Sequence, residues 1–120
     1  EWRFSIKERA EIKDEISLIY YELINPKFPI KSNLCTFLSY DFPDKSVVLV
    51  QEFDDDEQIT ISARRRDGKV FMNDMLEFAT QGLERAGGGG HKPAAGGRIL
   101  KKDKSIFKER VLEWLKSQKN

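Results

Sequence analysis

The stretch Ser46–Arg64, SVVLVQEFDDDEQITISAR, decides the fold, because two strands with different burial follow one another within it. Its first part, Ser46–Phe53, contains the continuous apolar run Val47–Val50, which is typical of a strand buried on both faces. Its last part, Gln58–Arg64, alternates strictly between apolar and polar residues. One face carries Ile59, Ile61 and Ala63, and the other carries Thr60, Ser62 and Arg64. We expect the two strands to pair in one sheet, the second with a polar face.

The connector between these strands is the acidic run Asp54–Glu57. Consecutive carboxylates can bind a metal ion, but in a strand connector they more often form a solvated loop. We favour the solvated loop.

Upstream of this stretch, the sequence predicts a helix and a strand. Ser5–Glu8 has the pattern of a capping box, and apolar residues at helical spacing follow until Asn25 and Pro26 end the helix. The residues at that spacing are Ile12, Ile16, Ile19, Tyr20 and Leu23. Asn33–Tyr40 is apolar and rich in strand formers, so we expect a strand there, before a turn at Phe42–Lys45.

Downstream, the sequence predicts a turn at Asp67–Gly68 and a helix that Asn73 caps and Gly87 ends. The apolar stripe of that helix is Met75, Leu76, Ala79, Leu83 and Ala86. A short strand at Arg98–Leu100 and a last helix at Ser105–Ser117 follow, the latter packing through Phe107, Val111, Leu112 and Leu115. The predicted order α-β-β-β-α-β-α indicates an α/β (α+β) fold, a mixed sheet of about four to five strands flanked by helices.

Length and composition limit the possible functions. A chain of 120 residues with 39% hydrophobic residues fits one compact domain. Its net charge of +1 does not mark a nucleic-acid binder, so an anion site must be local. The single Cys35, beside apolar neighbours, predicts a buried thiol and excludes a disulfide framework. No membrane-length apolar run or signal peptide is visible, so we expect a cytoplasmic protein.

The most unusual segment is Gly87–Gly97, GGGGHKPAAGG, which holds six of the eight glycines. Successive glycine N–H groups can form a concave nest for an anion, and His91 and Lys92 add donors beside it. This chemistry suits a phosphate or a carboxylate. The segment lacks the Lys-Ser/Thr ending of a P-loop, and its glycines follow a helix, unlike those of a dinucleotide fingerprint. A flexible linker, or a glycine-eased connection with a surface histidine, is the alternative.

The second candidate is the polar face of the strand at residues 58–64. An arginine at Arg64 can bind a phosphate through two hydrogen bonds, and the Ser62 hydroxyl on the same face is a second donor. Arg65 alternates to the other face unless the strand has already ended. The alternative is a solvated strand end that carries the basic triplet Arg64–Arg66. Core packing explains Trp2, Trp114 and the phenylalanines, and no stacking platform for bases is visible in the sequence.

Catalysis by this chain alone is not expected. One histidine, His91, and one cysteine, Cys35, cannot supply a binuclear metal site, and no serine flanks the histidine to act as a nucleophile. We therefore expect no catalytic residue and no metal ligand here.

Taken together, the two candidate segments resemble a known family. Ile61–Arg64, then a helix, then Gly88–His91 with Ala94–Gly96, is similar to the C-terminal DHH-associated (DHHA-type) domain of DHH-family phosphoesterases. That superfamily includes RecJ-like exonucleases, nano-RNases and cyclic-dinucleotide phosphodiesterases. The resemblance covers roughly residues 34–115, and residues 1–30 match nothing in it. We interpret residues 1–30 as a linker helix from an N-terminal catalytic domain and residues 31–120 as the substrate-binding domain.

The resemblance implies a division of labour between two domains. The catalytic domain holds metal ions, manganese or magnesium, and this chain carries none of its motifs. The associated domain contacts a phosphate or a terminal nucleotide. The residues that match the gripping positions are Ser62, Arg64, Gly88, Gly89, Gly90 and His91, with Lys92 at a variable position. The implied partners are the catalytic domain of the same parent chain and a single-stranded nucleic acid, an oligonucleotide or a nucleotide.

Two other functions remain open from the sequence. A related domain ends alanyl-tRNA synthetases, where it binds RNA or dimerises. His91 and Ala94–Gly96 favour the phosphoesterase branch over that one. The third possibility is a structural interaction domain without a ligand. The sequence does not distinguish DNA, RNA and cyclic dinucleotides as substrates.

Overall fold

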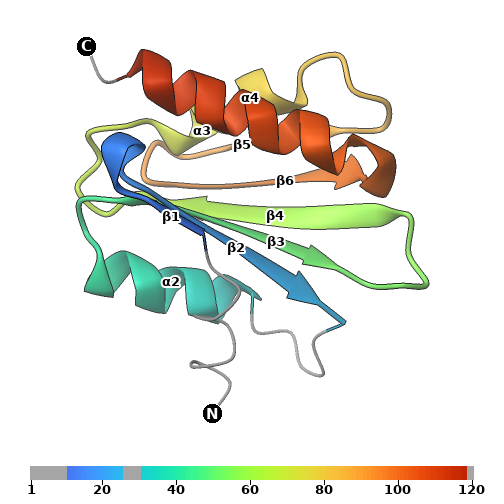
Figure 1. Ribbon diagram of the computed structural model, residues 1–120, viewed down its shortest axis with the longest axis horizontal. Helices are drawn as coiled ribbons and strands as arrows, with labels where there is room; N and C mark the ends of the chain where they lie inside the picture. The colour runs from blue at the N-terminus through green and yellow to red at the C-terminus, as the bar shows by residue number, and fades with distance from the viewer. Residues whose placement is uncertain (1–10, 26–30, 119–120) are drawn as a thin grey trace.

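The computed structural model describes residues 11–25 and 31–118, which form one six-stranded sheet with helices on both faces (Figure 1). The strands are β1 (Glu11–Lys13), β2 (Leu18–Ile24), β3 (Ser46–Glu52), β4 (Gln58–Arg64), β5 (Gly87–Gly90) and β6 (Ala94–Leu100). The helices are α2 (Lys31–Asp41), α3 (Met72–Thr80) and α4 (Lys104–Ser117), with short 3-10 helices η1 (Asp14–Ile16) and η2 (Lys101–Asp103). This architecture confirms the predicted fold class. None of the described helices is long and apolar enough to cross a membrane.

The strands follow the order β1-β2-β3-β4-β6-β5. Only the β2–β3 pair is parallel within this sheet, and α2 forms the crossover that connects two parallel strands. The predicted pairing of residues 46–52 with residues 58–64 is confirmed, with Val48 opposite Ala63. The sequence placed a third strand at Asn33–Tyr40, but its position beside β3 is taken by β2.

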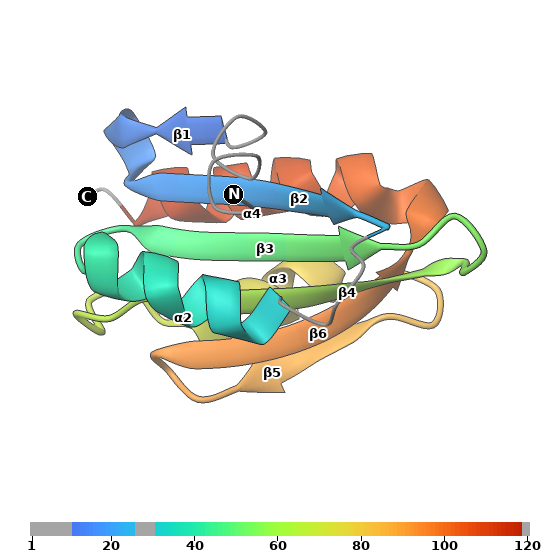
Figure 2. The ribbon, with the colours of Figure 1, turned by 90° about the horizontal axis from the view of Figure 1, so that it is seen from below.

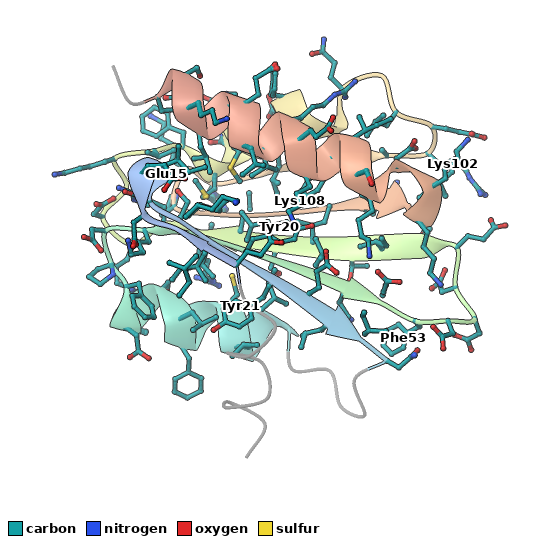
Figure 3. All side chains as sticks on the ribbon, viewed as in Figure 1. Glu15, Tyr20, Tyr21, Phe53, Lys102 and Lys108 are labelled. Carbon is teal, nitrogen blue, oxygen red and sulfur yellow. The ribbon has the colours of Figure 1, made fainter. Side chains whose placement is uncertain are left out.

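The two faces of the sheet bury different side chains. α3 and α4 cover one face, where Val48, Ile61 and Phe107 belong to the larger core, and α2 covers β2 and β3 on the other. Figure 3 shows the consequence in β2, where Tyr20 lies toward α4 and Tyr21 toward α2. β3 is likewise buried on both faces, as its apolar run predicts. In Figure 2, α2 lies in front of β3 and β4, whereas β6 and β5 extend past it toward the edge of the sheet.

The predicted N-terminal helix is wrong over the described residues 11–25, which form β1, η1 and β2. The reason is that Leu18–Leu23 is almost continuously apolar, so it satisfies a helical spacing and a two-faced strand equally well. Burial of both faces decides for the strand, because Ile19 and Tyr20, adjacent in sequence, are each 1% exposed on opposite sides of the sheet. The capping box at Ser5–Glu8 lies outside the described residues.

The predicted strand at Asn33–Tyr40 is also wrong, since these residues form most of α2. Its buried residues Leu34, Cys35 and Leu38 recur at helical spacing, whereas Phe37 and Tyr40 are exposed. A short apolar run of this composition suits a strand and a buried helix equally well. It forms a helix here because it packs on the face that β2 and β3 present. Cys35 is fully buried, as predicted.

Two boundaries downstream differ from the sequence predictions. α3 begins at Met72 with Phe71 as its N-cap residue, so Asn73 lies inside the first turn instead of capping it. The helix ends at Thr80, and Gly87 starts β5 instead of ending a helix. Leu83 and Ala86 still pack against the core, but from the connection after α3. The last helix, α4, is confirmed within one residue.

Candidate ligand-binding site

The glycine-rich segment is a β-hairpin at the edge of the sheet. β5 pairs with β6 from Gly87 opposite Arg98 to Gly90 opposite Ala95. At the turn, the His91 N–H donates to the Ala94 carbonyl at 2.9 Å and the Ala94 N–H donates to the His91 carbonyl at 3.2 Å. Successive N–H groups of an extended strand point in opposite directions, so they do not converge into a nest. The segment is therefore neither a concave nest nor a flexible linker.

The tip of this hairpin is fixed to the connection between β4 and α3. The Arg65 N–H donates to the Pro93 carbonyl at 2.9 Å, and the Met72 N–H donates to the Lys92 carbonyl at 2.8 Å. The Lys92 ammonium also lies 4.6 Å from the centre of the Phe71 ring. These contacts hold the turn beside the end of β4.

Several of the glycines are required by their surroundings; a Cβ on Gly97, for example, would lie 2.7 Å from the Gly87 carbonyl oxygen. A Cβ on Gly88 would lie 2.9 Å from Cβ of Leu76 and 3.1 Å from its carbonyl oxygen, so glycine lets β5 lie directly under α3. Gly90 has φ +139°, a conformation that L side chains rarely adopt, just before the turn. Gly88 therefore has a packing role against the helix.

The opposite face of β4, β6 and β5 is open. Ile59, Ile61 and Ala63 point to the α3 and α4 core, so Ser62 and Arg64 point to the side of α2. α2 contacts β3 and β4, and β6 and β5 carry no described helix on this side. Ser62 lies opposite Gly96, which in turn lies opposite Gly89. The polar face of β4 thus lies beside a surface of β6 and β5 that consists largely of glycine backbone.

Two adjoining depressions follow this open face. The first, of about 210 Å³, is lined by Ser62, Arg64, Gly89 and Gly90 together with Ala63 and Ala94–Gly96. The second, of about 520 Å³, shares Ser62 and Gly89 and includes Gly88. Five of the seven predicted gripping residues therefore line one or other depression.

The remaining two predicted residues, His91 and Lys92, lie in the turn that follows Gly90. Both are exposed, and neither lines a depression. They are nevertheless close to Arg64 along the sheet. Arg64 pairs with Ala94, and the backbone of Ala94 makes the hydrogen bonds that close the turn with His91. The hairpin, and not the helix before it, brings the two predicted segments together.

The three consecutive arginines have different surroundings. Arg65 continues the alternation to the α4 side, where it lies near Leu115, is 7% exposed and donates to Asp67 at 2.8 Å and to the Ser46 hydroxyl at 3.3 Å. Arg66 stacks on Tyr40. The half-buried side chain of Arg64 has no hydrogen bond or ion pair to the part of the chain that the structure describes.

The Arg65–Asp67 pair predicts a pH dependence of stability. Hydrogen bonding from Arg65 lowers the pKa of the Asp67 carboxyl below its ordinary value of 3.8. A carboxyl whose pKa is lower in the folded state stabilises the fold above the ordinary value, and that stabilisation is lost as pH falls through the folded-state pKa. We expect urea unfolding between pH 6 and pH 2 to show a smaller loss of stability for Asp67→Asn than for the wild type. Parallel curves would contradict this.

Two residues of the open face, Thr60 and Arg98, were not among the binding residues predicted from the sequence. They are opposite one another in the β4–β6 register, and both line the larger depression. Thr60 continues the alternation of Ser62 and Arg64, so the signal was present. Arg98 could be placed on this face only once β6 was known to begin at Ala94.

The acidic connector Asp54–Glu57 is exposed, and Glu57 accepts a hydrogen bond from Arg85 at 2.9 Å. Within residues 11–25 and 31–118, no three His, Cys, Asp or Glu side chains are grouped so that they could hold a metal ion. The described part of the chain therefore offers no cluster of side chains for a metal centre.

The structure thus defines a mixed α/β domain. The edge of its sheet is a glycine-rich hairpin, which lies beside an open polar face. The DHHA1 domain family matches residues 16–117, and the chain belongs to this family. The matched region begins just before β2, so it includes β2, the strand that pairs with β3.

Solved structures share the fold. The C-Ala domain of Aquifex aeolicus alanyl-tRNA synthetase is 19% identical, with a TM-score of 0.67 over 86% of this chain and 91% of that chain. The pGpG-specific phosphodiesterase PggH from Vibrio cholerae is 12% identical, with a TM-score of 0.68 over 97% of this chain and 38% of that one. RecJ from Thermus thermophilus, in complex with Mg2+, is 20% identical, with a TM-score of 0.64 over 96% and 17%. A search of curated proteins finds no match. The chain covers 38% of PggH and 17% of RecJ, so it corresponds to only a minor part of either enzyme.

Proposed function

We propose that this chain is the substrate-binding domain of a DHH-family metal-dependent phosphodiesterase. In this proposal it holds a phosphate or terminal nucleotide of a short single-stranded nucleic acid on the open face of β4, β6 and β5. Arg64 and Ser62 are the side chains that contact the ligand, and the glycine hairpin supplies backbone. His91 and Lys92 contact the ligand from the turn.

The observation that carries the proposal is the contrast among the three arginines. Arg65 and Arg66 have partners within the chain, whereas Arg64 has none among the described side chains and lines a depression instead. A guanidinium group presents paired donors that match two phosphate oxygens. Because Arg64 is half-buried at this depression, such a contact is less screened than one made by a fully exposed side chain.

The hairpin suits close approach of a polar ligand. β5 is the edge strand, so alternate backbone N–H and C=O groups remain available on its outer side. Gly89 and Gly96 have no side chains to keep a ligand away from the Ser62 hydroxyl. The anchored turn keeps this surface in one conformation, which lowers the entropic cost of binding.

In this proposal, hydrolysis takes place in a separate N-terminal DHH domain that binds manganese or magnesium. The likeness to RecJ and PggH supports it, and RecJ has been solved with Mg2+ and with Mn2+. The binding domain contributes orientation by holding a neighbouring part of the substrate. The chain alone is then not an enzyme. A cytoplasmic location remains a prediction.

A second function is favoured by the likeness to the C-Ala domain, because this chain covers 91% of that domain and not a small part of a larger enzyme. In that case the chain is an RNA-binding or dimerising appendage. Both functions use a basic group on the open face, so the size and strandedness of the ligand distinguish them.

The experiment is calorimetric titration of the chain with four probes: 5′-phosphorylated single-stranded DNA and RNA trinucleotides, pGpG, and a tRNA acceptor-stem duplex. We expect binding of at least one short single strand, weakened by salt, because ion pairing with phosphate is screened. Added manganese should produce no hydrolysis. Binding of the duplex alone would support the second function, and binding of no probe would refute the phosphodiesterase proposal and the RNA-binding form of the second function.

A further inference from the structure

A stacked pair of side chains lies close to the proposed phosphate site. The guanidinium carbon of Arg66 is 3.5 Å from the centre of the Tyr40 ring, and Nη2 of Arg66 donates to the Ser39 hydroxyl at 3.4 Å. At this distance the guanidinium is in van der Waals contact with the ring face, and arginine favours a stacked arrangement there. Ser39 is 1% exposed and Tyr40 is 63% exposed. A buried hydroxyl therefore fixes a planar cation over an exposed ring.

The pair lies on the same side of the sheet as Arg64. Arg64 is opposite Val47, which packs in the α2 core, and Tyr40 belongs to α2 itself. In Figure 2 the C-terminal end of α2, the end of β4 and the turn between β5 and β6 lie at one end of the sheet. Arg66 follows Arg64 by two residues, about 7 Å along an extended chain. The stacked pair is thus one short step from the depression at Arg64.

The chemistry of this pair suits a nucleobase. Unstacked bases are bound on aromatic rings and on the planes of arginine guanidinium groups, because every base has a π face. The inner face of the guanidinium rests on Tyr40, which leaves its outer face for a ligand. A bare phosphate would not contact the flat face of the Arg66 guanidinium. A phosphate followed by a base would contact both residues, the phosphate at Arg64 and the base at Arg66.

We propose that Arg66 and Tyr40 form a stacking platform for the nucleobase next to the phosphate held at Arg64. This inference rests on the proposed function and specifies its ligand. The ligand is a nucleotide or single-stranded oligonucleotide, and not a base-free phosphate ester or polyphosphate.

The test compares two probes of equal charge, a 5′-phosphorylated deoxyadenosine trinucleotide and a 5′-phosphorylated trinucleotide of abasic deoxyribose. Arg66→Lys keeps the charge and removes the plane, and Tyr40→Ala removes the ring beneath it. We expect each variant to weaken binding of the adenine probe about 5- to 150-fold, the range of one stacked base, and to change binding of the abasic probe less than about twofold. Tyr40→Phe keeps the ring and should bind like the wild type.

The matched control is Arg85→Lys. Arg85 is an exposed arginine that pairs with Glu57 just before the start of β4, whereas Arg66 follows its end. This variant should leave both affinities unchanged. Equal losses for the two probes in Arg66→Lys, or no loss for either, would overturn the platform. If Arg64→Ala still weakens binding of both probes in that case, the phosphate site stands without the platform. Absence of wild-type binding to both probes would overturn the platform and the proposed function together.

Discussion

Replacement of Arg64 by alanine is expected to weaken binding of a 5′-phosphorylated trinucleotide about 10- to 150-fold. Arg64 lines the depression beside the glycine hairpin, and its side chain has no competing partner among the described residues. A charge-assisted hydrogen bond is worth about 1.5–3 kcal/mol, which corresponds to that range of affinity. Calorimetric titration at two salt concentrations measures the loss, and melting curves show whether the fold is intact.

The control for this prediction is Arg85→Ala, which removes the same charge outside the proposed site. Arg85 is exposed and pairs only with Glu57 among the described side chains. It should bind the trinucleotide within about twofold of the wild type, because exposed ion pairs contribute little. Equal affinity of wild type and Arg64→Ala would refute the site. A large fall in melting temperature together with lost binding would instead assign Arg64 a structural role.

Replacement of Gly88 by alanine is expected to lower the free energy of unfolding by about 1–3 kcal/mol, the usual cost of overpacking a close contact. The added Cβ would meet Cβ, the carbonyl oxygen and the carbonyl carbon of Leu76 at 2.9–3.3 Å. Leu76 is fully buried in α3, so α3 must move away from the sheet. Urea unfolding gives the loss as a shift of the midpoint at constant slope.

Its matched control is the preceding residue of the same strand. A Cβ on Gly87 would have no neighbour within 4 Å. Gly87→Ala should therefore be neutral or slightly stabilising, because alanine reduces the entropy of the unfolded chain. If the two variants were equally stable, the close approach of β5 and α3 would not be the reason for glycine at position 88.

The sequence was most informative where a pattern had only one explanation. The alternation of Gln58–Arg64 correctly predicted a strand, its buried face and its polar face, and with them Ser62 and Arg64 on one side. The apolar run Val47–Val50 correctly predicted a strand buried on both faces. These two strands and α4 define the mixed sheet with a helical cover, which is enough for the fold class.

The errors fell where two explanations fit equally. Leu18–Leu23 and Leu34–Leu38 are both short apolar runs, and each was assigned the wrong type of element. Their structure depends on partners far away in the sequence: β2 needs the edge of β3, and α2 needs the face that β2 and β3 form. Local composition does not contain that information.

The site was predicted in its residues but not in its shape. The glycine run suggested a loop, whereas the structure uses Gly88 to fit β5 under α3. The stacked pair of Tyr40 and Arg66 was invisible in the sequence, because its two residues come from α2 and from the segment after β4. Contacts of this kind require the tertiary fold.

The position of β2 sets a limit on where this domain can be divided. β2 lies inside the sheet between β1 and β3, so a shortened chain that starts at residue 31 would lack it. β3 would then lose its hydrogen bonds to β2 along Ser46–Glu52, and it would become a new edge strand of the sheet. Such an edge invites pairing between molecules and aggregation. Any gene rearrangement or engineered truncation that preserves a folded domain must therefore keep the chain from Leu18 onward.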